Sequence, residues 1–413
     1  MEEMTEKTRQ KVKYGIIGVG NMGSAHLDNF MNGKIADSVV TAVADIDRAK
    51  LDRVKNKYPS ANFEYYRSGE DLIEKSDADA VIIAVPHYFH SELAISAMRR
   101  HKHVICEKPA GVYTKQVKEM NAEADKSDVL FTVMFNQRTN CVYRKMREII
   151  LSGGIGSVKR INWIITDWYR NQAYYDSGEW RATWDGEGGG VLLNQCPHQL
   201  DLIQWVTGMT PKTVRAFCSF GKWHDIETED DVTAYFEYEN GATGVFVTST
   251  ADAPGVNRFQ VTGSLGSIVC DGNELKYIRN DEDERKFCFE AKDGFLAPKC
   301  EEIKVETDGK NPQHVGIIEN FTEAILGREP LFVKGQEGLM GVELMDACLL
   351  SEWLGKSIEL PIDDDLYLEE LDKRRKSSRK KAVKSCKPCV SDLSGTYGGQ
   401  SAKSDFFSAT ANE

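Results

Sequence analysis

Two stretches of the sequence bring together side chains that can move a proton. The first is the run 106–109, Cys-Glu-Lys-Pro, which follows a short apolar segment. The second is a glycine-rich stretch, 188–201, in which Asn194 and His198 stand four residues apart. Residues four apart share one face of a helix. A histidine titrates near neutral pH and a lysine can donate to a developing alkoxide, so Lys108 and His198 are candidates for acid–base catalysis.

A third motif, Gly18-Val19-Gly20-Asn21-Met22-Gly23, matches the pattern GxGxxG. It lies between an apolar strand and a predicted helix over 22–31. Glycines there let the backbone approach a pyrophosphate at the helix N-terminus. Asp45 closes the next predicted strand, where a carboxylate accepts hydrogen bonds from the adenine ribose hydroxyls. These features predict a dinucleotide cofactor.

The charge of Asp45 favours NAD over NADP, because a carboxylate repels a 2′-phosphate. Ile46 offers no cation in its place, and we expect Arg48 to point into the following helix. The predicted cofactor-binding set comprises Gly18, Gly20, Asn21, Met22, Gly23, Asp45, Pro86, His90, Glu107, Lys108 and Asn136.

Aromatic and hydrogen-bonding side chains are dense just before the glycine-rich stretch. Flat apolar faces of sugars stack on aromatic rings, and arginine and asparagine bind hydroxyls or a carboxylate. An interface loop is the alternative interpretation. For His87 and His90, which follow the third strand, a substrate contact and a helix-start role are equally compatible with the sequence. The predicted substrate-binding set comprises Asn194, Arg170, Trp168, Tyr169, Trp180, Arg181 and His87.

The chain of 413 residues is long enough for two domains. Apolar runs separated by amphipathic stretches predict a parallel sheet of strands at 14–18, 39–45, 80–86, 103–106 and 129–135. Alternating segments at 158–166, 213–220, 231–238, 244–250 and 258–262 predict a mostly antiparallel sheet, with helices at 194–207, 313–326 and 335–355. The expected fold is α/β: a Rossmann domain (1–135), an α+β domain (136–371) and a tail (372–413).

Composition narrows the class of protein. A net charge of −12 argues against a nucleic-acid binder, and no apolar run is long enough to cross a membrane. The charged first residues lack a secretory pattern, which favours the cytoplasm. Ten irregularly spaced cysteines are expected as thiols, and the pair Cys386/Cys389 lacks the second pair of a zinc site, so no metal is predicted. The basic stretch 373–387 and the Ser/Gly-rich end are interpreted as a flexible tail; a partner-binding surface is the alternative.

Taken in order, these motifs resemble the Gfo/Idh/MocA oxidoreductase family. The resemblance rests on the GxGxxG strand–helix unit, Glu107-Lys108-Pro109, the run 135–138 (Phe-Asn-Gln-Arg) and the glycine-rich stretch with His198 and Asp201. It implies a nicotinamide cofactor, sugar- or inositol-like substrates, and catalytic roles for Lys108 and His198. Many members resembling this chain have aspartate where it has Asn194. Asparagine cannot take a proton but can orient a hydroxyl.

The sequence therefore predicts an NAD-dependent dehydrogenase of a secondary hydroxyl on a sugar, glycoside or inositol, with C3 as one candidate position. It resembles bacterial glycoside 3-oxidoreductases. An alternative is a redox-neutral glycosidase with tightly bound NAD, acting through a 3-keto intermediate and elimination. A non-catalytic sugar or cofactor sensor is a third interpretation, but a sensor needs neither Lys108 nor His198.

The second sheet also predicts a homo-oligomer. Its strands carry apolar residues on both faces, as Ile161, Trp163 and Ile165 do on one side and Ile164 on the other. Helices can cover only one of these faces, so the other is expected to be buried against a second subunit. The family resemblance implies sheet-to-sheet dimers that can pair into tetramers or larger assemblies.

Overall fold

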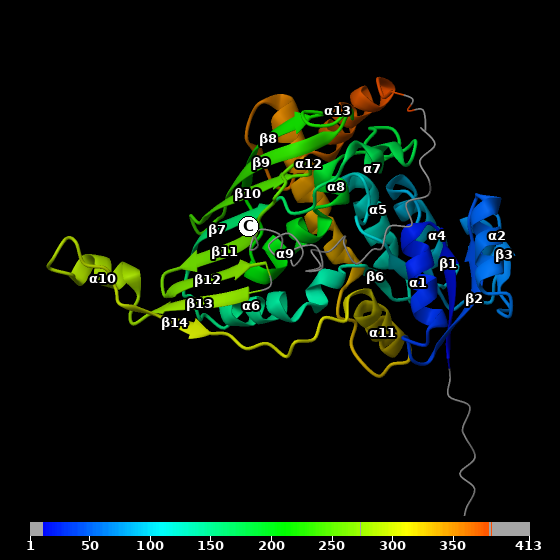
Figure 1. Cartoon of the computed structure of the whole chain (residues 1–413), viewed down its shortest axis with the longest axis horizontal. Coiled ribbons are helices and arrows are strands. Elements are labelled where there is room, and N and C mark those ends of the chain that lie inside the picture. Colours follow the sequence, from blue (N-terminus) through cyan, green and yellow to red (C-terminus); the bar gives the residue numbers. More distant parts are fainter. Residues whose placement is uncertain (1–10, 273, 380, 382–413) are drawn as a thin grey trace, which may run out of the picture. The chain divides into compact units, whose positions relative to one another are not determined.

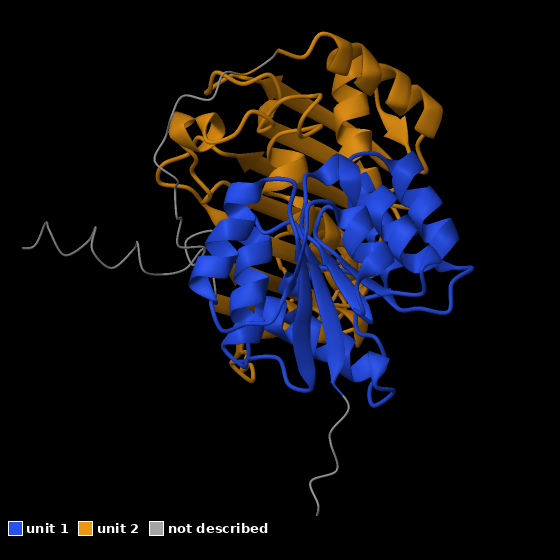
Figure 2. Cartoon of the chain, turned by 90° about the vertical axis from the view of Figure 1, so that its right-hand side faces the viewer, with its two compact units in different colours: residues 1–140, 310–342 blue, residues 141–309, 343–413 orange. Residues whose placement is uncertain are grey.

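The computed structural model describes residues 11–272, 274–379 and 381, and it divides them into two compact units (Figures 1 and 2). Unit 1 takes in the described residues up to 140 together with 310–342. Unit 2 takes in residues 141–309 and the described residues from 343 onwards.

Unit 1 contains a six-stranded parallel sheet in the order β3-β2-β1-β4-β5-β6. All four residues of β4 are buried, as expected for a parallel strand covered on both faces. The predicted parallel sheet is confirmed. The sequence analysis missed β3, a three-residue edge strand without an apolar pattern. The strands are β1 (Val12–Ile17), β2 (Ser38–Ala44), β3 (Glu64–Tyr66), β4 (Ala80–Ile83), β5 (His103–Cys106) and β6 (Phe131–Val133).

Two helices of unit 1, α2 and α3, begin at side-chain caps. Asp47 accepts a hydrogen bond from the backbone N–H of Ala49, and Ser68 accepts one from Asp71. The α-helices are α1 (Asn21–Met31), α2 (Arg48–Lys57), α3 (Gly69–Lys75), α4 (His90–Arg99), α5 (Thr114–Ala124) and α11 (Gln313–Ile325); the 3-10 helices are η1 (His87–Phe89), η2 (Asn136–Thr139) and η3 (Gly335–Glu337).

Unit 2 contains a nine-stranded sheet in the order β14-β13-β12-β11-β7-β10-β9-β8-β15. Every neighbouring pair is antiparallel except β7 and β10, which run parallel. The predicted mostly antiparallel sheet is confirmed. Its strands are β7 (Val158–Ile165), β8 (Thr213–Phe220), β9 (Glu229–Glu237), β10 (Thr243–Ser249), β11 (Asn257–Gly263), β12 (Gly266–Asp271), β13 (Glu274–Asn280), β14 (Cys300–Lys304) and β15 (Ile358–Glu359).

Side chains on the covered face of this sheet form an aromatic core. Trp163 on β7 stacks on Phe259 of the neighbouring β11 with ring centroids 4.1 Å apart, and Tyr143 of α6 lies 5.9 Å from Trp163.

None of the helices in the described part of the chain has the length and apolar character needed to cross a bilayer. Unit 2 contributes α6 (Cys141–Leu151), α7 (Gln172–Asp176), α8 (Val191–Asn194), α9 (Pro197–Thr207), α10 (Glu284–Glu290) and α13 (Asp364–Lys376), and α12 runs over Gly338–Leu354.

Two boundaries differ from the sequence-based expectation. Residues 310–342 belong to unit 1 and not to the second domain predicted over 136–371. Tertiary contacts override chain order there, because Ile317, Ile318 and Phe321 of α11 are buried and the hydroxyl of Thr322 lies 2.8 Å from that of Tyr14 on β1. The tail predicted from 372 begins inside α13, which continues to Lys376. Cys386 and Cys389 lie outside the described residues.

Candidate functional site

The three glycines of the GxGxxG motif have three different physical roles. Gly18 has a φ of +88°, and a Cβ there would lie 2.4 Å from the carbonyl oxygen of Ala84. A Cβ on Gly23 would lie 1.8 Å from the carbonyl oxygen of Gly18, so only glycine lets α1 pack this closely on β1. A Cβ on Gly20 would meet nothing within 4 Å. This open approach leads to the start of α1, whose Asn21–Met22 turn has no side-chain cap, and it fits a pyrophosphate.

Asp45 lies directly after β2 and is buried, as the cofactor prediction requires. One carboxylate oxygen accepts the backbone N–H of Val19 at 2.9 Å, and the other accepts that of Asp47 at 2.9 Å. A carboxylate has about four acceptor positions, so capacity for ribose hydroxyls remains. Arg48 pairs with Asp52 along α2, as expected. The sequence analysis missed Lys50, whose Nζ lies 3.4 Å from Asp45.

Glu107, which was predicted to bind the cofactor, has both carboxylate oxygens hydrogen-bonded within unit 1, and its cofactor contact remains a prediction. One oxygen lies 2.6 Å from Nε2 of His26 on α1, and the other accepts the backbone N–H of Lys108 at 3.2 Å. Burial disfavours its charge, but the hydrogen bond from His26 and the nearby Lys108 outweigh burial and lower the Glu107 pKa to about 2. Glu107 therefore holds the backbone of Lys108, and the Lys108–Pro109 bond is cis.

His26 is the partner that the sequence analysis missed. The sequence did contain a signal for it: His26 stands three residues after Gly23 on the predicted helix, which places it on the same buried face. Its ring lies 5.4 Å from that of His314 on α11. Burial lowers the pKa of His314 to about 4, against the pull of Glu107. His314 is therefore neutral at pH 7.

His90, also predicted at the cofactor site, connects two loops, and its cofactor contact remains a prediction. It is fully buried, and its two ring nitrogens lie 2.8 Å from the carbonyl oxygen of Pro109 and 2.9 Å from that of Val85. The two nitrogens thus contact the loop that follows β4, at Val85, and the loop that follows β5, at Pro109. Pro86 caps η1, and His87, the first residue of η1, is buried with its ring 5.6 Å from that of His90.

Asn136 lies at the start of η2 and is likewise fully buried. Its side-chain amide donates to Gln313 of α11, to which Gln137 also donates at 3.1 Å. Asn136 therefore packs η2 against α11, and its predicted cofactor contact remains a prediction.

In unit 2 the backbone of the glycine stretch 188–190 lies close to β9 and to the buried carboxylate of Glu229. A Cβ on Gly190 would lie 1.9 Å from the carbonyl oxygen of Glu229 on β9. One carboxylate oxygen of Glu229 accepts the backbone N–H groups of Gly190 at 2.8 Å and Leu192 at 3.0 Å. Burial raises the pKa of Glu229 to about 7 although these bonds oppose the rise. The sequence analysis missed Glu229, which is 39 residues away from the loop that it holds.

The predicted single helix over 194–207 is wrong. The structure has α8 ending at Asn194 and α9 beginning at Pro197, which has no N–H and restricts Cys196. The helical spacing argument for Asn194 and His198 therefore does not hold. His198 lies in the first turn of α9 and is buried.

Asn194 is the centre of a directed hydrogen-bond chain. Its amide nitrogen donates to Glu187, whose second oxygen accepts the N–H of Ala182 at 2.5 Å. Its amide oxygen accepts from the Tyr174 hydroxyl at 3.2 Å and from Gln195 at 3.0 Å. The ionised Glu187 carboxylate can only accept hydrogen bonds, so the Asn194 side chain must turn its NH₂ group toward Glu187 and its oxygen toward Tyr174. Any further hydrogen bond from the Asn194 side chain is therefore donated.

Arg181 extends this chain by donating to the Tyr174 hydroxyl at 3.0 Å. Burial raises the pKa of Tyr174 against the opposing charge of Arg181, so the phenol stays protonated and donates. Arg181 also lies 4.6 Å over the rings of Trp180 and Tyr174. The predicted residues Trp180, Arg181 and Asn194 are thus brought together, with Tyr174 and Glu187 between them.

Three other predicted substrate residues, Trp168, Tyr169 and Arg170, follow the end of β7. Arg170 donates to the carbonyl oxygens of Trp168 and Tyr169, and its guanidinium lies 5.2 Å from the Tyr174 ring. Trp168 donates to Thr248 at 3.4 Å, whereas Tyr169 is exposed. Arg170 is therefore largely engaged with its own loop.

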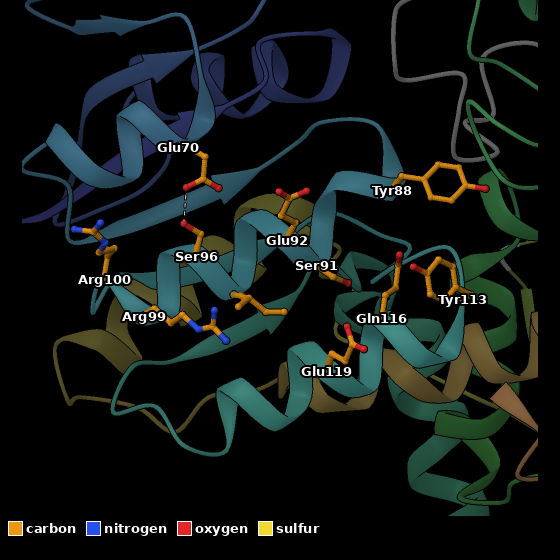
Figure 3. A pocket seen from close by; sticks show the side chains of 11 residues that line it. Glu70, Tyr88, Ser91, Glu92, Ser96, Arg99, Arg100, Tyr113, Gln116 and Glu119 are labelled. Atoms are coloured by element: carbon orange, nitrogen blue, oxygen red, sulfur yellow. Dashed lines mark hydrogen bonds between the residues drawn. The ribbon is translucent and has the colours of Figure 1, made fainter. Parts of the chain in front are cut away.

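A surface groove of about 570 Å³ on unit 1 lies between α4 and α5 (Figure 3). Two of its charged lining groups are already paired: Glu70 accepts from Ser96 at 2.6 Å, and Arg99 donates to Glu123 at 2.8 Å. None of the predicted site residues lines it, so we assign the groove no role in the chemistry.

Family comparisons agree with this geometry. Residues 12–135 match the model of the oxidoreductase family with an NAD-binding Rossmann fold, and residues 143–269 match the GFO/IDH/MocA C-terminal domain. The chain belongs to the Gfo/Idh/MocA oxidoreductase family. It is an oxidoreductase with an NAD-binding Rossmann domain.

Two curated relatives and a solved structure are similar to this chain over 48–86% of its length. Myo-inositol 2-dehydrogenase of Thermotoga maritima is 27% identical over 84% of this chain and 98% of its own. Inositol 2-dehydrogenase of Rubrobacter xylanophilus is 28% identical over 48% of this chain and 52% of its own. The WlbA dehydrogenase of Bordetella pertussis, crystallised with NADH and UDP-GlcNAcA, is 23% identical with a TM-score of 0.71, covering 86% of this chain and 100% of its own.

The two motif glycines give a paired prediction for this Gfo/Idh/MocA member. Gly23→Ala places a methyl group against backbone and should destabilise the fold by about 1–3 kcal/mol, the usual cost of overpacking. Gly20→Ala meets no protein atom, so the thermal midpoint should stay unchanged while NAD affinity falls. Calorimetry and thermal unfolding measure both effects. Unchanged NAD binding in Gly20→Ala would contradict the proposed approach of the pyrophosphate.

The raised pKa of Glu229 predicts a pH-dependent stability. Its folded pKa of about 7 exceeds the ordinary 4.5, so the folded state holds a proton that the unfolded state has lost. Stability therefore falls as the pH rises from 4.5 through 7, by about 3 kcal/mol for this group. Glu229→Gln should remove this dependence, whereas Glu237→Gln, on the exposed face of the same strand, should keep it. Denaturant unfolding at pH 5 and pH 8 decides, and parallel pH profiles of Glu229→Gln and wild type would refute the assignment.

Proposed function

We propose that the enzyme oxidises a secondary hydroxyl of an inositol, sugar or glycoside, with C3 as one candidate carbon. The observation that carries this proposal is the hydrogen-bond chain from Arg181 through Tyr174 and Asn194 to Glu187, beside the ring of Trp180. The chain fixes the uncharged Asn194 amide as a donor beside an aromatic face, which suits a polyhydroxylated substrate. The similarity to inositol dehydrogenases supports the same substrate class.

NAD supplies the hydride acceptor when bound. The open approach at Gly20 and the start of α1 fit its pyrophosphate, and Asp45 fits its adenine ribose. We propose a preference for NAD over NADP, because Asp45 disfavours a 2′-phosphate; Lys50 partly offsets this charge. Lys108 and His198 are the proposed groups that handle the hydroxyl proton, since removal of hydride requires loss of that proton.

A direct test follows absorbance at 340 nm while inositols, sugars and glycosides are offered with NAD or NADP in parallel. We expect NAD-linked reduction with a polyol substrate, and NMR of the product identifies the oxidised carbon. An absence of reduction across the panel would contradict the proposal. Release of an aglycone without net NADH would instead support the redox-neutral glycosidase.

Substitution of the two proposed acid–base residues should separate chemistry from cofactor binding. Lys108→Ala and His198→Ala should each lower turnover by roughly 10²-fold or more, the scale of general acid–base catalysis. NAD affinity should change little in His198→Ala, because His198 is outside the predicted cofactor-binding set, and Lys126→Ala, at an exposed position of unit 1, should behave as wild type. Stopped-flow turnover and NAD titration provide the readouts, and near-normal turnover in both alanine variants would exclude these roles.

An exchange of Asn194 and Glu187 tests whether Asn194 contacts the substrate or only holds its loop. Asn194→Asp places two carboxylates together and should lower stability and turnover. The double variant Asn194→Asp, Glu187→Gln restores a donor–acceptor pair with the original charge, so the thermal midpoint should recover. Turnover should stay at least about tenfold low, because an aspartate offers no N–H donor. Full recovery of turnover would show a structural role alone.

We also propose that the second face of the unit 2 sheet forms a contact between subunits. Ile164, Phe217 and Tyr235 on this face are 42%, 59% and 40% exposed. In the ladder, Val247 on β10 pairs with Ile164 on β7, which makes the apolar surface continuous across strands. Such a surface in a protein without membrane-spanning helices among its described residues suits a self-association interface.

Light scattering tests this interface. The full chain should have a particle mass that is a multiple of one chain, and the double variant Ile164→Asp, Phe217→Asp should shift it to a smaller species. Phe289→Asp, on α10 and 81% exposed, serves as the matched control and should leave the mass unchanged. A monomeric full-length protein would be inconsistent with the proposal.

A further inference from the structure

The described residues that follow α13 are hydrogen-bonded to the aromatic-rich segment 172–187 of unit 2, directly and through Glu227. Here the described residues 377–379 and 381 are called the strap. Ser378 donates its hydroxyl to one oxygen of Glu227, and the backbone N–H of Arg379 donates to the other oxygen at 2.9 Å. The backbone N–H of Trp184 also donates to Glu227, at 2.7 Å. One carboxylate therefore joins the strap to the segment that leads into Glu187.

A second anchor lies at the other end of that segment. Nζ of Lys381 donates to the carbonyl oxygen of Tyr175 at 2.6 Å and lies 3.8 Å from the carboxylate of Asp176. The side chain of Lys381 is only 18% exposed, so this contact is shielded from bulk water. A cation at the last turn of α7 also satisfies a carbonyl that the helix leaves without a backbone donor.

The base of the strap is rigidly packed. Trp353 of α12 stacks on Tyr367 of α13 with centroids 5.4 Å apart, and the guanidinium of Arg374 lies 3.8 Å over the Trp353 ring. The ring of Trp184 packs edge-on against Trp353 at 5.6 Å. The strap therefore starts from a fixed aromatic cluster and not from a frayed helix end.

The two anchored positions are flanked by side chains of the directed hydrogen-bond chain. Tyr174 immediately precedes the carbonyl that Lys381 binds, and Glu187 follows Trp184 by three residues. We propose that Ser378 and Lys381 are positioning residues for the substrate, which hold the segment 172–187 in the conformation that aligns Tyr174 and Glu187 on Asn194. This inference rests on the proposed function, because it takes that hydrogen-bond chain as a substrate contact. The strap lies outside both segments that match the family models, so it would give this member its own substrate preference.

Two truncations and three point variants test the proposal. Removal of residues 382–413 keeps both anchors, whereas removal of residues 377–413 deletes them. Lys381→Ala deletes one anchor, Lys381→Arg keeps a cation there, and Lys376→Ala removes an exposed lysine of α13 as the matched control. Hydrogen exchange of residues 172–187 is measured without ligand, and KM, kcat and NAD affinity are measured with the polyol found in the activity panel.

We expect faster exchange over 172–187 in the 377–413 deletion and in Lys381→Ala, and wild-type exchange in the other three variants. KM should rise about tenfold in the same two variants, the scale of a lost charge-assisted hydrogen bond, with kcat and NAD affinity little changed. Unchanged exchange in Lys381→Ala would overturn the anchoring, and raised exchange with an unchanged KM would overturn the positioning role. If the wild type oxidises no polyol, the proposed function fails, while the exchange data still decide the anchoring.

Discussion

Buried carboxylates that accept backbone N–H groups hold the candidate catalytic segments of both units. Glu107 accepts the N–H of Lys108, Glu229 accepts those of Gly190 and Leu192, and Glu187 accepts that of Ala182. A buried charge is costly unless it is hydrogen-bonded, so each carboxylate favours the one backbone geometry that satisfies it. The neighbouring loops need glycine, because a Cβ on Gly190 would clash with the strand that carries Glu229.

The environments of these carboxylates differ and so do their proton affinities. Glu107 lies beside His26 and Lys108 and stays ionised well below neutral pH. At Glu229 burial dominates and raises the pKa to about 7. The first group therefore supplies a permanent negative charge beside a lysine, whereas the second can carry a proton near neutral pH.

Local patterns predicted the parts of the fold that depend on local interactions. The apolar runs gave the parallel strands, the alternating segments gave the second sheet, and GxGxxG with Asp45 gave the dinucleotide loop. These features depend on residues within one or two elements. One local prediction was wrong because of a single residue. The apolar pattern predicted one helix from Asn194 onwards, but Pro197 begins a new helix.

The missed features are contacts between residues far apart in the chain. His26 meets Glu107, Glu229 meets Gly190, and Glu227 meets Ser378, over sequence separations of 81, 39 and 151 residues. The residues next to a polar side chain in an alternating strand, or after a charged helix, do not indicate which distant residue it will hydrogen-bond. The strap was interpreted as a tail for this reason, because its basic composition resembles that of solvated termini.

The return of residues 310–342 to unit 1 makes that unit discontinuous and constrains how the chain can be synthesised and folded. The ribosome releases the GxGxxG strand and its sheet first, but the hydroxyl contact of Tyr14 and the ion pair of Arg138 wait for Thr322 and Glu337. The nascent first unit must therefore persist without α11 while residues 141–309 emerge. A gene fragment that stops at the end of the Rossmann match would lack these partners permanently.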